Sequence, residues 1–137
     1  MNADPVLTIE LRLLVYTALV SLVVWVPYIL AEIKTRGLVR AVGYPSGVVD
    51  DLPAWAQRNH RAHLNLVENL APFAVLVLVA HVTGVSNGAT VLGAQLFFWS
   101  RVVHIAVMIA GIPWVRTLAF AAGLLGNLII LGQILYA

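Results

Sequence analysis

Long apolar stretches alternate with short polar ones along the chain, and the second apolar stretch is unusual because its first half is polar. A helix that crosses a bilayer needs about 20 mostly apolar residues. Four stretches meet that length, over residues 11–33, 55–82, 89–110 and 114–136. Pro27 lies inside the first and is expected to kink it. The pattern therefore predicts an all-α fold, an integral membrane four-helix bundle.

The composition supports a lipid environment. Apolar residues make up 61% of the 137 residues and charged residues 10%, whereas soluble domains carry roughly 25% charged residues. A soluble domain this short leaves a large share of its surface in water, so it has too little interior for so many apolar side chains. We expect one transmembrane domain over residues 1–137, in contact with membrane lipids.

The residue types exclude several kinds of chemistry. The chain has no cysteine, which excludes disulfides, thiolate metal sites and a cysteine nucleophile, so a reacting thiol must arrive with a ligand. No histidine stands at metal-ligand spacing from carboxylates, so no metal site is expected. The formal net charge is only +2 and the basic residues form no dense run, so nucleic acid is not an expected partner.

Basic residues lie mostly in or near two of the three connections between the predicted helices. The first connection, residues 34–53, is long and rich in glycine and proline, and the third, residues 111–113, is a tight turn. The basic residues near them are Lys34, Arg36, Arg40, Arg58, Arg61, Arg101 and Arg116. The positive-inside rule then places both connections in the cytoplasm and both termini on the opposite side.

The polar half of the second stretch is the strongest sign of a binding site. Arg61, Asn65 and Glu68 stand at i, i+4 and i+7, which puts them on one helical face, and Arg58 precedes them by one turn. Solvated residues at a helix end, with one internal Arg–Glu pair, are the alternative. That alternative explains Arg58 well but Glu68 poorly, because the apolar run starts right after it. Charges inside a membrane usually face a bundle interior or a water-filled cavity. Arginines bind carboxylates through two parallel hydrogen bonds, so the cluster favours a small ligand with carboxylates and an ammonium group.

The third and fourth stretches add weaker signals toward the same end of the bundle. Arg101 and His104 stand at i and i+3, although a lone membrane histidine is often a packing residue. Arg116 and Thr117 open the fourth stretch, where free N–H groups and the helix dipole favour an anion such as a thiolate. A simple positive-inside anchor is the alternative for Arg116.

Small residues recur every fourth position in the last stretch, at Ala119 and Gly123, and Asn127 follows with the same spacing. Small residues at this spacing let helices approach closely in lipid. The pattern fits packing within the chain and an oligomer contact equally well.

The second stretch contains the run Arg58-x-x-Arg61-Ala62-His63-Leu64-Asn65-x-x-Glu68-Asn69-x-x-Pro72-Phe73. This run resembles the signature of the MAPEG family, the membrane-associated proteins in eicosanoid and glutathione metabolism. The resemblance is closest to the microsomal glutathione S-transferase type. Two further segments resemble the family's third and fourth helices, namely Arg101-x-x-His104 and Gly111-x-Pro113-x-x-Arg116-Thr117.

The resemblance implies a homotrimer in a bacterial inner membrane, with glutathione as cosubstrate between neighbouring subunits near the cytoplasmic face. It implies that glutathione is held by Arg58, Arg61, Asn65, Glu68, Arg101 and His104. Arg116 would be the catalytic residue that stabilises the thiolate. The implied activity is a glutathione transferase or peroxidase acting on lipophilic electrophiles.

Two departures from the family pattern bear on that activity. Conjugating members commonly carry tyrosines where this chain has Met108 and Phe120. A non-catalytic lipid-binding or assembly protein with the MAPEG fold is therefore the alternative function. A proton-coupled exporter that uses Glu68 is a third hypothesis, disfavoured because Glu68 lies in an arginine-rich stretch near one membrane face.

Overall fold

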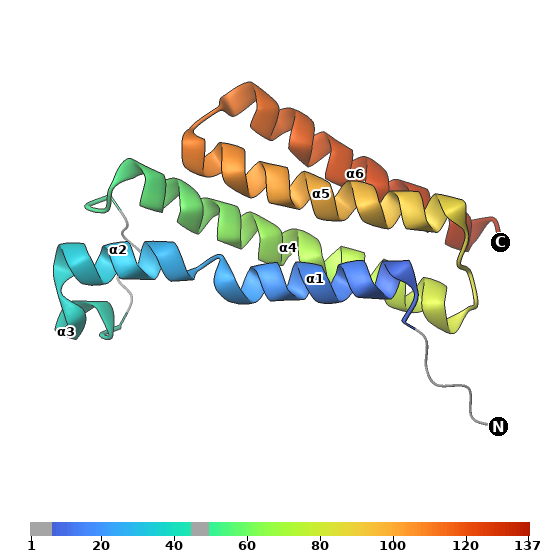
Figure 1. The fold of residues 1–137 in the computed structure, drawn as a ribbon, viewed down its shortest axis with the longest axis horizontal. Coiled ribbons are helices and arrows are strands. Elements are labelled where there is room, and N and C mark those ends of the chain that lie inside the picture. The colour runs from blue at the N-terminus through green and yellow to red at the C-terminus, as the bar shows by residue number, and fades with distance from the viewer. Residues whose placement is uncertain (1–6, 45–49) are drawn as a thin grey trace.

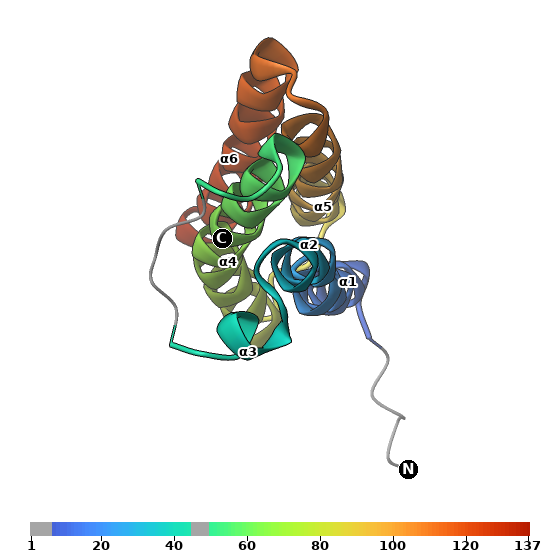
Figure 2. The same cartoon turned by 90° about the vertical axis from the view of Figure 1, so that its left-hand side faces the viewer.

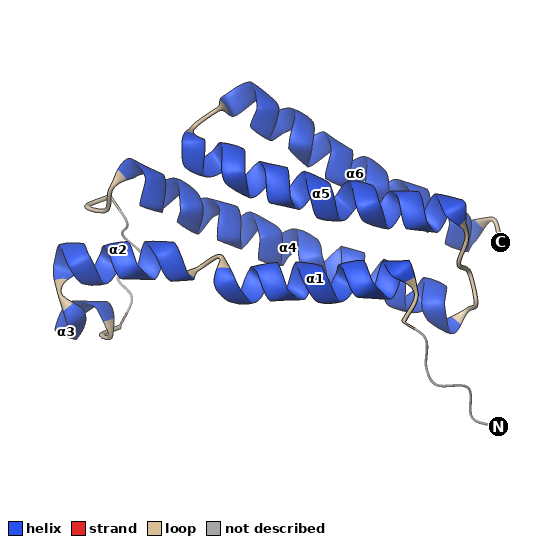
Figure 3. Ribbon diagram, in the orientation of Figure 1, coloured by secondary structure: helices blue, strands red, loops and turns tan. Residues whose placement is uncertain are grey.

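The computed structural model describes residues 7–44 and 50–137, and within these ranges the chain is helical with no strand (Figure 3). The helices are α1 (Ile9–Val23), α2 (Val26–Arg36), α3 (Leu38–Ala41), α4 (Ala54–Val82), α5 (Gly88–Ala110) and α6 (Pro113–Leu135). The predicted all-α fold is confirmed, and the predicted bounds of the last three long helices agree with α4, α5 and α6 to within one residue.

The helix predicted over residues 11–33 is present as two pieces, α1 and α2, that follow one another in one line (Figure 1). The break falls at Val24 and Trp25, just before Pro27. A proline has no N–H to donate and its ring crowds the carbonyl four residues earlier, here that of Val23. The last residue of α1 is therefore Val23, and the disturbance expected from Pro27 is present as a break between two helices that stay nearly in line.

Four segments are long and apolar enough to cross a membrane, namely Ile9–Arg36, Ala54–Val82, Gly88–Ala110 and Pro113–Leu135. Many large apolar side chains on their outer faces have no protein cover, and Leu22 and Leu118 are 68% and 70% exposed. In water this surface would favour aggregation, whereas lipid is a matching solvent for it. The chain is an integral membrane protein.

The helices lie side by side with two distinct ends (Figures 1 and 2). We call one end the arginine end; it holds the start of α4 and the turn at Gly111 between α5 and α6. The other, the α1 end, holds the start of α1, the connection from α4 to α5 and the end of α6 (Figure 1).

An apolar core joins α1, α4, α5 and α6 at the middle of the bundle and toward the α1 end. The rings of Phe73 and Phe97 stack with centroids 4.0 Å apart, and both side chains are fully buried. Leu13, Val77 and Ile130 pack around them. This contact fixes the rotation of α4 against α5 and so decides which faces of these helices meet at the arginine end.

Small residues bring α5 and α6 unusually close together. A Cβ added to Gly93 would lie 2.6 Å from the carbonyl oxygen of Gly126, and one added to Gly123 would lie 2.6 Å from Oγ of Ser100. Ala119 is buried in the same contact. The four-residue spacing of small residues in α6 thus serves packing within the chain.

The first connection, between α2 and α4, contains the short helix α3. Residues 45–49 of this connection lie outside the described part. Arg36 pairs with Glu32 and with Asp51, to which its Nε donates a hydrogen bond of 2.8 Å. This hydrogen bond holds the pKa of Asp51 below its ordinary value. The pair anchors the polypeptide just before α4, and so helps to set where α4 begins.

Candidate functional site

A cavity of about 440 Å³ lies near the arginine end, between α4, α5 and α6. Its lining residues are Arg61, Leu64, Asn65, Glu68, His104, Met108, Arg116, Thr117 and Phe120. Five of the seven side chains predicted to bind or activate a ligand are in this set, namely Arg61, Asn65, Glu68, His104 and Arg116. Three helices thus bring the predicted residues to one place.

The α4 wall carries the polar face predicted from the sequence. Arg61 and Glu68 are exposed and Asn65 is partly buried, as their spacing along one helical face requires. Within residues 7–44 and 50–137, the ion pairs formed are those of Arg36. Arg61 and Glu68 therefore do not pair with one another, and the internal pair of the alternative interpretation does not form. Both charges are left to interact with a ligand.

Arg101 lies behind the cavity wall and not on it. The side chain is buried, at 2% exposure, and its Nη1 donates to Oδ1 of Asn65 at 2.8 Å. Its Nη2 donates to the carbonyls of Ala119 at 3.3 Å and Phe120 at 3.4 Å. Asn65 then has its Nδ2 donors left for other partners. Arg101 therefore positions Asn65.

The partners of Arg101 within the described residues are neutral, so its positive charge is not cancelled. Its Cζ lies 5.6 Å from the ring centre of Phe97 and 5.5 Å from that of Phe120, on whose faces a cation is attracted. An uncancelled charge acts strongly across a low-dielectric interior. Arg101, Arg61 and Arg116 together make the cavity attractive to anions.

Arg58 is placed elsewhere, although the sequence grouped it with Arg61. Its Nε and Nη2 donate to the carbonyl of Ile109 at 3.2 and 2.9 Å, near the left-handed Gly111 that ends α5. Cations commonly satisfy the last carbonyls of a helix in this way. Arg58 borders a separate hollow of about 170 Å³, of which Met108 and Arg116 also form part. Its observed contact is a cap on α5.

His104 is 5% exposed and lines the cavity from α5. Met108 lies one turn further along and is 8% exposed, and Phe120 faces the same cavity from α6. The two positions that depart from the family pattern are therefore part of the cavity wall, and neither side chain carries a hydroxyl group.

Besides Met108 and Phe120, two more lining residues were not predicted as binding residues. Leu64 lies one turn after Arg61 on the same face of α4, and Thr117 follows Arg116, with its hydroxyl donating to the carbonyl of Pro113 at 3.3 Å. The helical spacing of Leu64 was the available signal, but an apolar residue in an apolar helix does not stand out from sequence alone.

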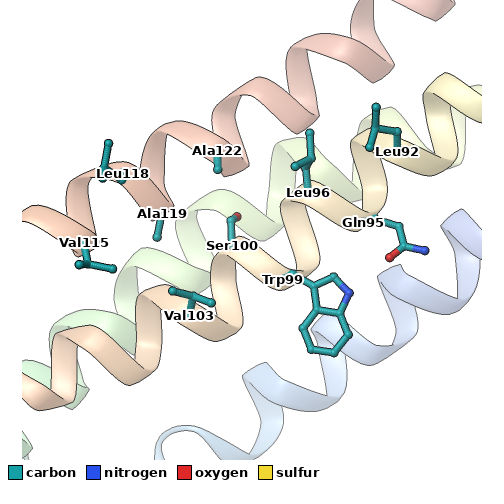
Figure 4. A pocket seen from close by; sticks show the side chains of 10 residues that line it. All are labelled: Leu92, Gln95, Leu96, Trp99, Ser100, Val103, Val115, Leu118, Ala119 and Ala122. Atoms are coloured by element: carbon teal, nitrogen blue, oxygen red, sulfur yellow. The ribbon is translucent and has the colours of Figure 1, made fainter.

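A second, apolar hollow of about 430 Å³ runs along the outer side of α5 and α6 (Figure 4). Trp99, Val103 and Leu118 line it, with Ser100 and Gln95 as its polar members. We call it the apolar groove.

No group of three His, Asp or Glu side chains able to hold a metal occurs in the described ranges. A comparison with protein families matches residues 13–136 to the MAPEG family, which is nearly the whole chain. Neither the curated proteins nor the solved structures gave a match.

Proposed function

The chain belongs to the MAPEG family, and on that premise we propose that it binds glutathione in the polar cavity and uses it against lipophilic electrophiles, as a transferase or peroxidase. The observation that carries the proposal is the charge pattern of the cavity. Arg61 and Arg116 supply positive charge and Glu68 supplies negative charge, around one volume of about 440 Å³. Ligand sites for small molecules measure roughly 300–1,000 Å³.

Glutathione matches that pattern group by group. It carries two carboxylates and one ammonium group, and a carboxylate is the natural partner of an arginine guanidinium. Glu68 is suited to the ammonium group, and the Nδ2 donors of Asn65 are suited to a carboxylate or a peptide carbonyl. The remaining group is the thiol, which we assign to the part of the cavity bordered by Arg116 and His104.

Arg116 is the residue best placed to stabilise a thiolate. It lies in the first turn of α6, where free N–H groups and the helix dipole add positive potential. Nearby cations lower the pKa of a thiol and raise the fraction of the reactive thiolate. The proposed catalytic role of Arg116 is to hold this anion, and Arg101 adds positive potential from behind the wall.

Both activities begin with attack by the thiolate sulfur of glutathione. In transfer to an aryl halide, the thiolate sulfur forms a bond to the ring carbon and halide leaves with the bonding electrons. In peroxide reduction, the thiolate attacks the terminal oxygen, the O–O bond breaks and an alcohol forms after proton uptake. A second glutathione then displaces hydroxide from the sulfenic acid, which gives the disulfide and water.

The apolar groove offers a place where a lipophilic electrophile can gather. It faces outward along α5 and α6, where lipid chains contact the bundle (Figure 4). A lipophilic substrate dissolved in the membrane can thus bind to the protein without crossing water.

Titration of the detergent-purified protein with glutathione tests the proposal. Binding is expected for the native chain and is expected to be lost in Arg61→Ala and Glu68→Ala. Arg12→Ala is the matched control, because Arg12 is exposed on α1 away from the cavity. Absence of glutathione binding by the native chain would overturn the proposal.

The alternative is a non-catalytic relative that keeps the cavity but binds a lipid or assembles with other proteins. Met108 and Phe120 favour it, because they leave the cavity wall without the two hydroxyl groups of conjugating members. Lipid that copurifies in the cavity, together with no turnover of an aryl halide and glutathione, would establish this alternative over the enzyme.

We also propose that the functional unit is a homotrimer in a bacterial inner membrane, with the arginine end in the cytoplasm. Exposed Arg61 and Glu68 support the trimer, since a neighbouring subunit can complete the site there. Native mass spectrometry with and without glutathione gives the subunit number, and cysteine labelling from either side of the membrane gives the orientation. A monomer that binds glutathione fully would refute the shared site.

A further inference from the structure

A carboxylate is buried at the α1 end, opposite the proposed glutathione cavity. Glu10 lies in the first turn of α1 and is 5% exposed. Its Oε1 accepts hydrogen bonds from Oγ of Ser86 at 2.9 Å and Oγ1 of Thr90 at 2.6 Å. Its Oε2 is buried and has no hydrogen-bond partner among residues 7–44 and 50–137.

One oxygen atom of this carboxylate, Oε1, has a structural role. Oε1 ties α1 to the start of α5, where Asn87 and Thr90 form a capping box, and the positive end of the α5 dipole favours an anion there. Oε2 has no such role. The ion pairs in the described parts of the chain all involve Arg36, so no described cationic side chain lies within ion-pair distance of Glu10. A buried charge without a counter-charge is costly.

Glu10 also lines a cavity of about 250 Å³. Thr8, His81, Gly84 and Ser86 form its polar side. Its apolar side is formed by Val77, Ala80 and Val85. The cavity is large for a bare metal ion, and the described residues hold no cluster of metal ligands. A carboxylate beside an apolar wall instead suits an organic cation with a short hydrocarbon part.

We propose that this cavity binds a primary ammonium group, with Oε2 of Glu10 as its counter-charge. A primary ammonium carries three N–H donors, and Oε2 of Glu10 and Oγ1 of Thr8 are acceptors on residues that line the same cavity. A quaternary ammonium has no N–H and cannot satisfy Oε2. The ammonium group comes either from the headgroup of a membrane lipid or from a free amine.

Thermal unfolding in phosphatidylcholine nanodiscs tests the proposal. The probes are ethanolamine hydrochloride, choline chloride and sodium chloride at equal ionic strength, and nanodiscs in which part of the phosphatidylcholine is replaced by phosphatidylethanolamine. Ligand at a hundredfold excess over its dissociation constant should raise the unfolding midpoint by at least about 2 °C. A rise with ethanolamine identifies a free amine as sufficient; a rise only with phosphatidylethanolamine identifies the lipid headgroup.

Glu10→Gln is the informative variant, because an amide oxygen still accepts from Ser86 and Thr90 while the charge is lost. The rise should disappear in Glu10→Gln and persist in Asp50→Asn, which removes the same charge from an exposed position. An equal rise in Glu10→Gln would overturn the proposal. Should that variant fail to fold, the native chain still decides: the proposal is overturned if ethanolamine raises the midpoint no more than choline or sodium does and phosphatidylethanolamine gives no rise either.

Discussion

Restoring a hydroxyl group at Phe120 is expected to strengthen glutathione binding. Phe120 lines the polar cavity, its side chain is exposed, and the centre of its ring lies 5.5 Å from Cζ of Arg101. Phe120→Tyr adds one oxygen at the ring tip and changes nothing else. The cavity of about 440 Å³ leaves room for that atom.

The magnitude follows from the group that the hydroxyl would contact. A hydrogen bond to a charged group contributes about 1.5–3 kcal/mol, and each 1.4 kcal/mol is a factor of ten in affinity. Donation to the thiolate or to a carboxylate of glutathione should therefore tighten binding roughly 10- to 100-fold. Where the acceptor is the thiolate, turnover of an aryl halide should rise as well.

Isothermal titration with glutathione and the initial rate of aryl halide conjugation are the two measurements. Phe98→Tyr is the matched control, since Phe98 lies on α5 outside the set that lines the cavity. The expected role of the hydroxyl group is refuted if Phe120→Tyr binds glutathione no more tightly than the native chain and Phe98→Tyr.

Three further predictions concern the frame around the cavity. Gly126→Ala should destabilise the protein by about 1–3 kcal/mol in thermal unfolding, because its Cβ would press on the backbone of α5, whereas Gly132→Ala, with open space around it, should not. Arg58→Ala should lower stability through loss of the α5 cap, yet leave glutathione affinity nearly unchanged; a loss as large as that of Arg61→Ala would place Arg58 in the binding site. Arg36 lowers the pKa of Asp51, so the stabilisation from their pair should be constant at neutral pH and disappear as pH falls below the ordinary value of 3.8. The unfolding midpoints of the native chain and Asp51→Asn should therefore converge in acid, and a constant difference down to low pH would contradict this.

The helices were predictable because a membrane sets their length. A segment that crosses hydrocarbon must satisfy all its backbone hydrogen bonds internally, so apolar length translates directly into a helix. The bounds of α4, α5 and α6 follow from that rule. The exact break between α1 and α2 was less accessible, since Pro27 indicates a kink without fixing where the preceding helix ends.

The cavity was predictable where residues on one helix face share a spacing, as Arg61, Asn65 and Glu68 do. It was not predictable that Arg61 lines the cavity whereas Arg58 contacts the end of α5. Only one turn separates them, but the close approach of α5 puts the carbonyl of Ile109 within reach of Arg58. The burial of Arg101 likewise depends on Gly123 in α6, whose missing side chain leaves space for the guanidinium group. No pattern in the sequence of α5 reveals that space.

Arg101 also constrains how the chain enters the membrane during synthesis. An arginine at the centre of a lone helix costs about 2.5–3.5 kcal/mol or more to insert. Its acceptors, the carbonyls of Ala119 and Phe120, belong to the following helix, and the tight turn at Gly111 brings that helix alongside. We therefore expect α5 and α6 to partition into the bilayer as a hairpin, with the guanidinium already bonded. Truncation of the chain after Gly111 should leave α5 poorly inserted, and extension through α6 should restore it.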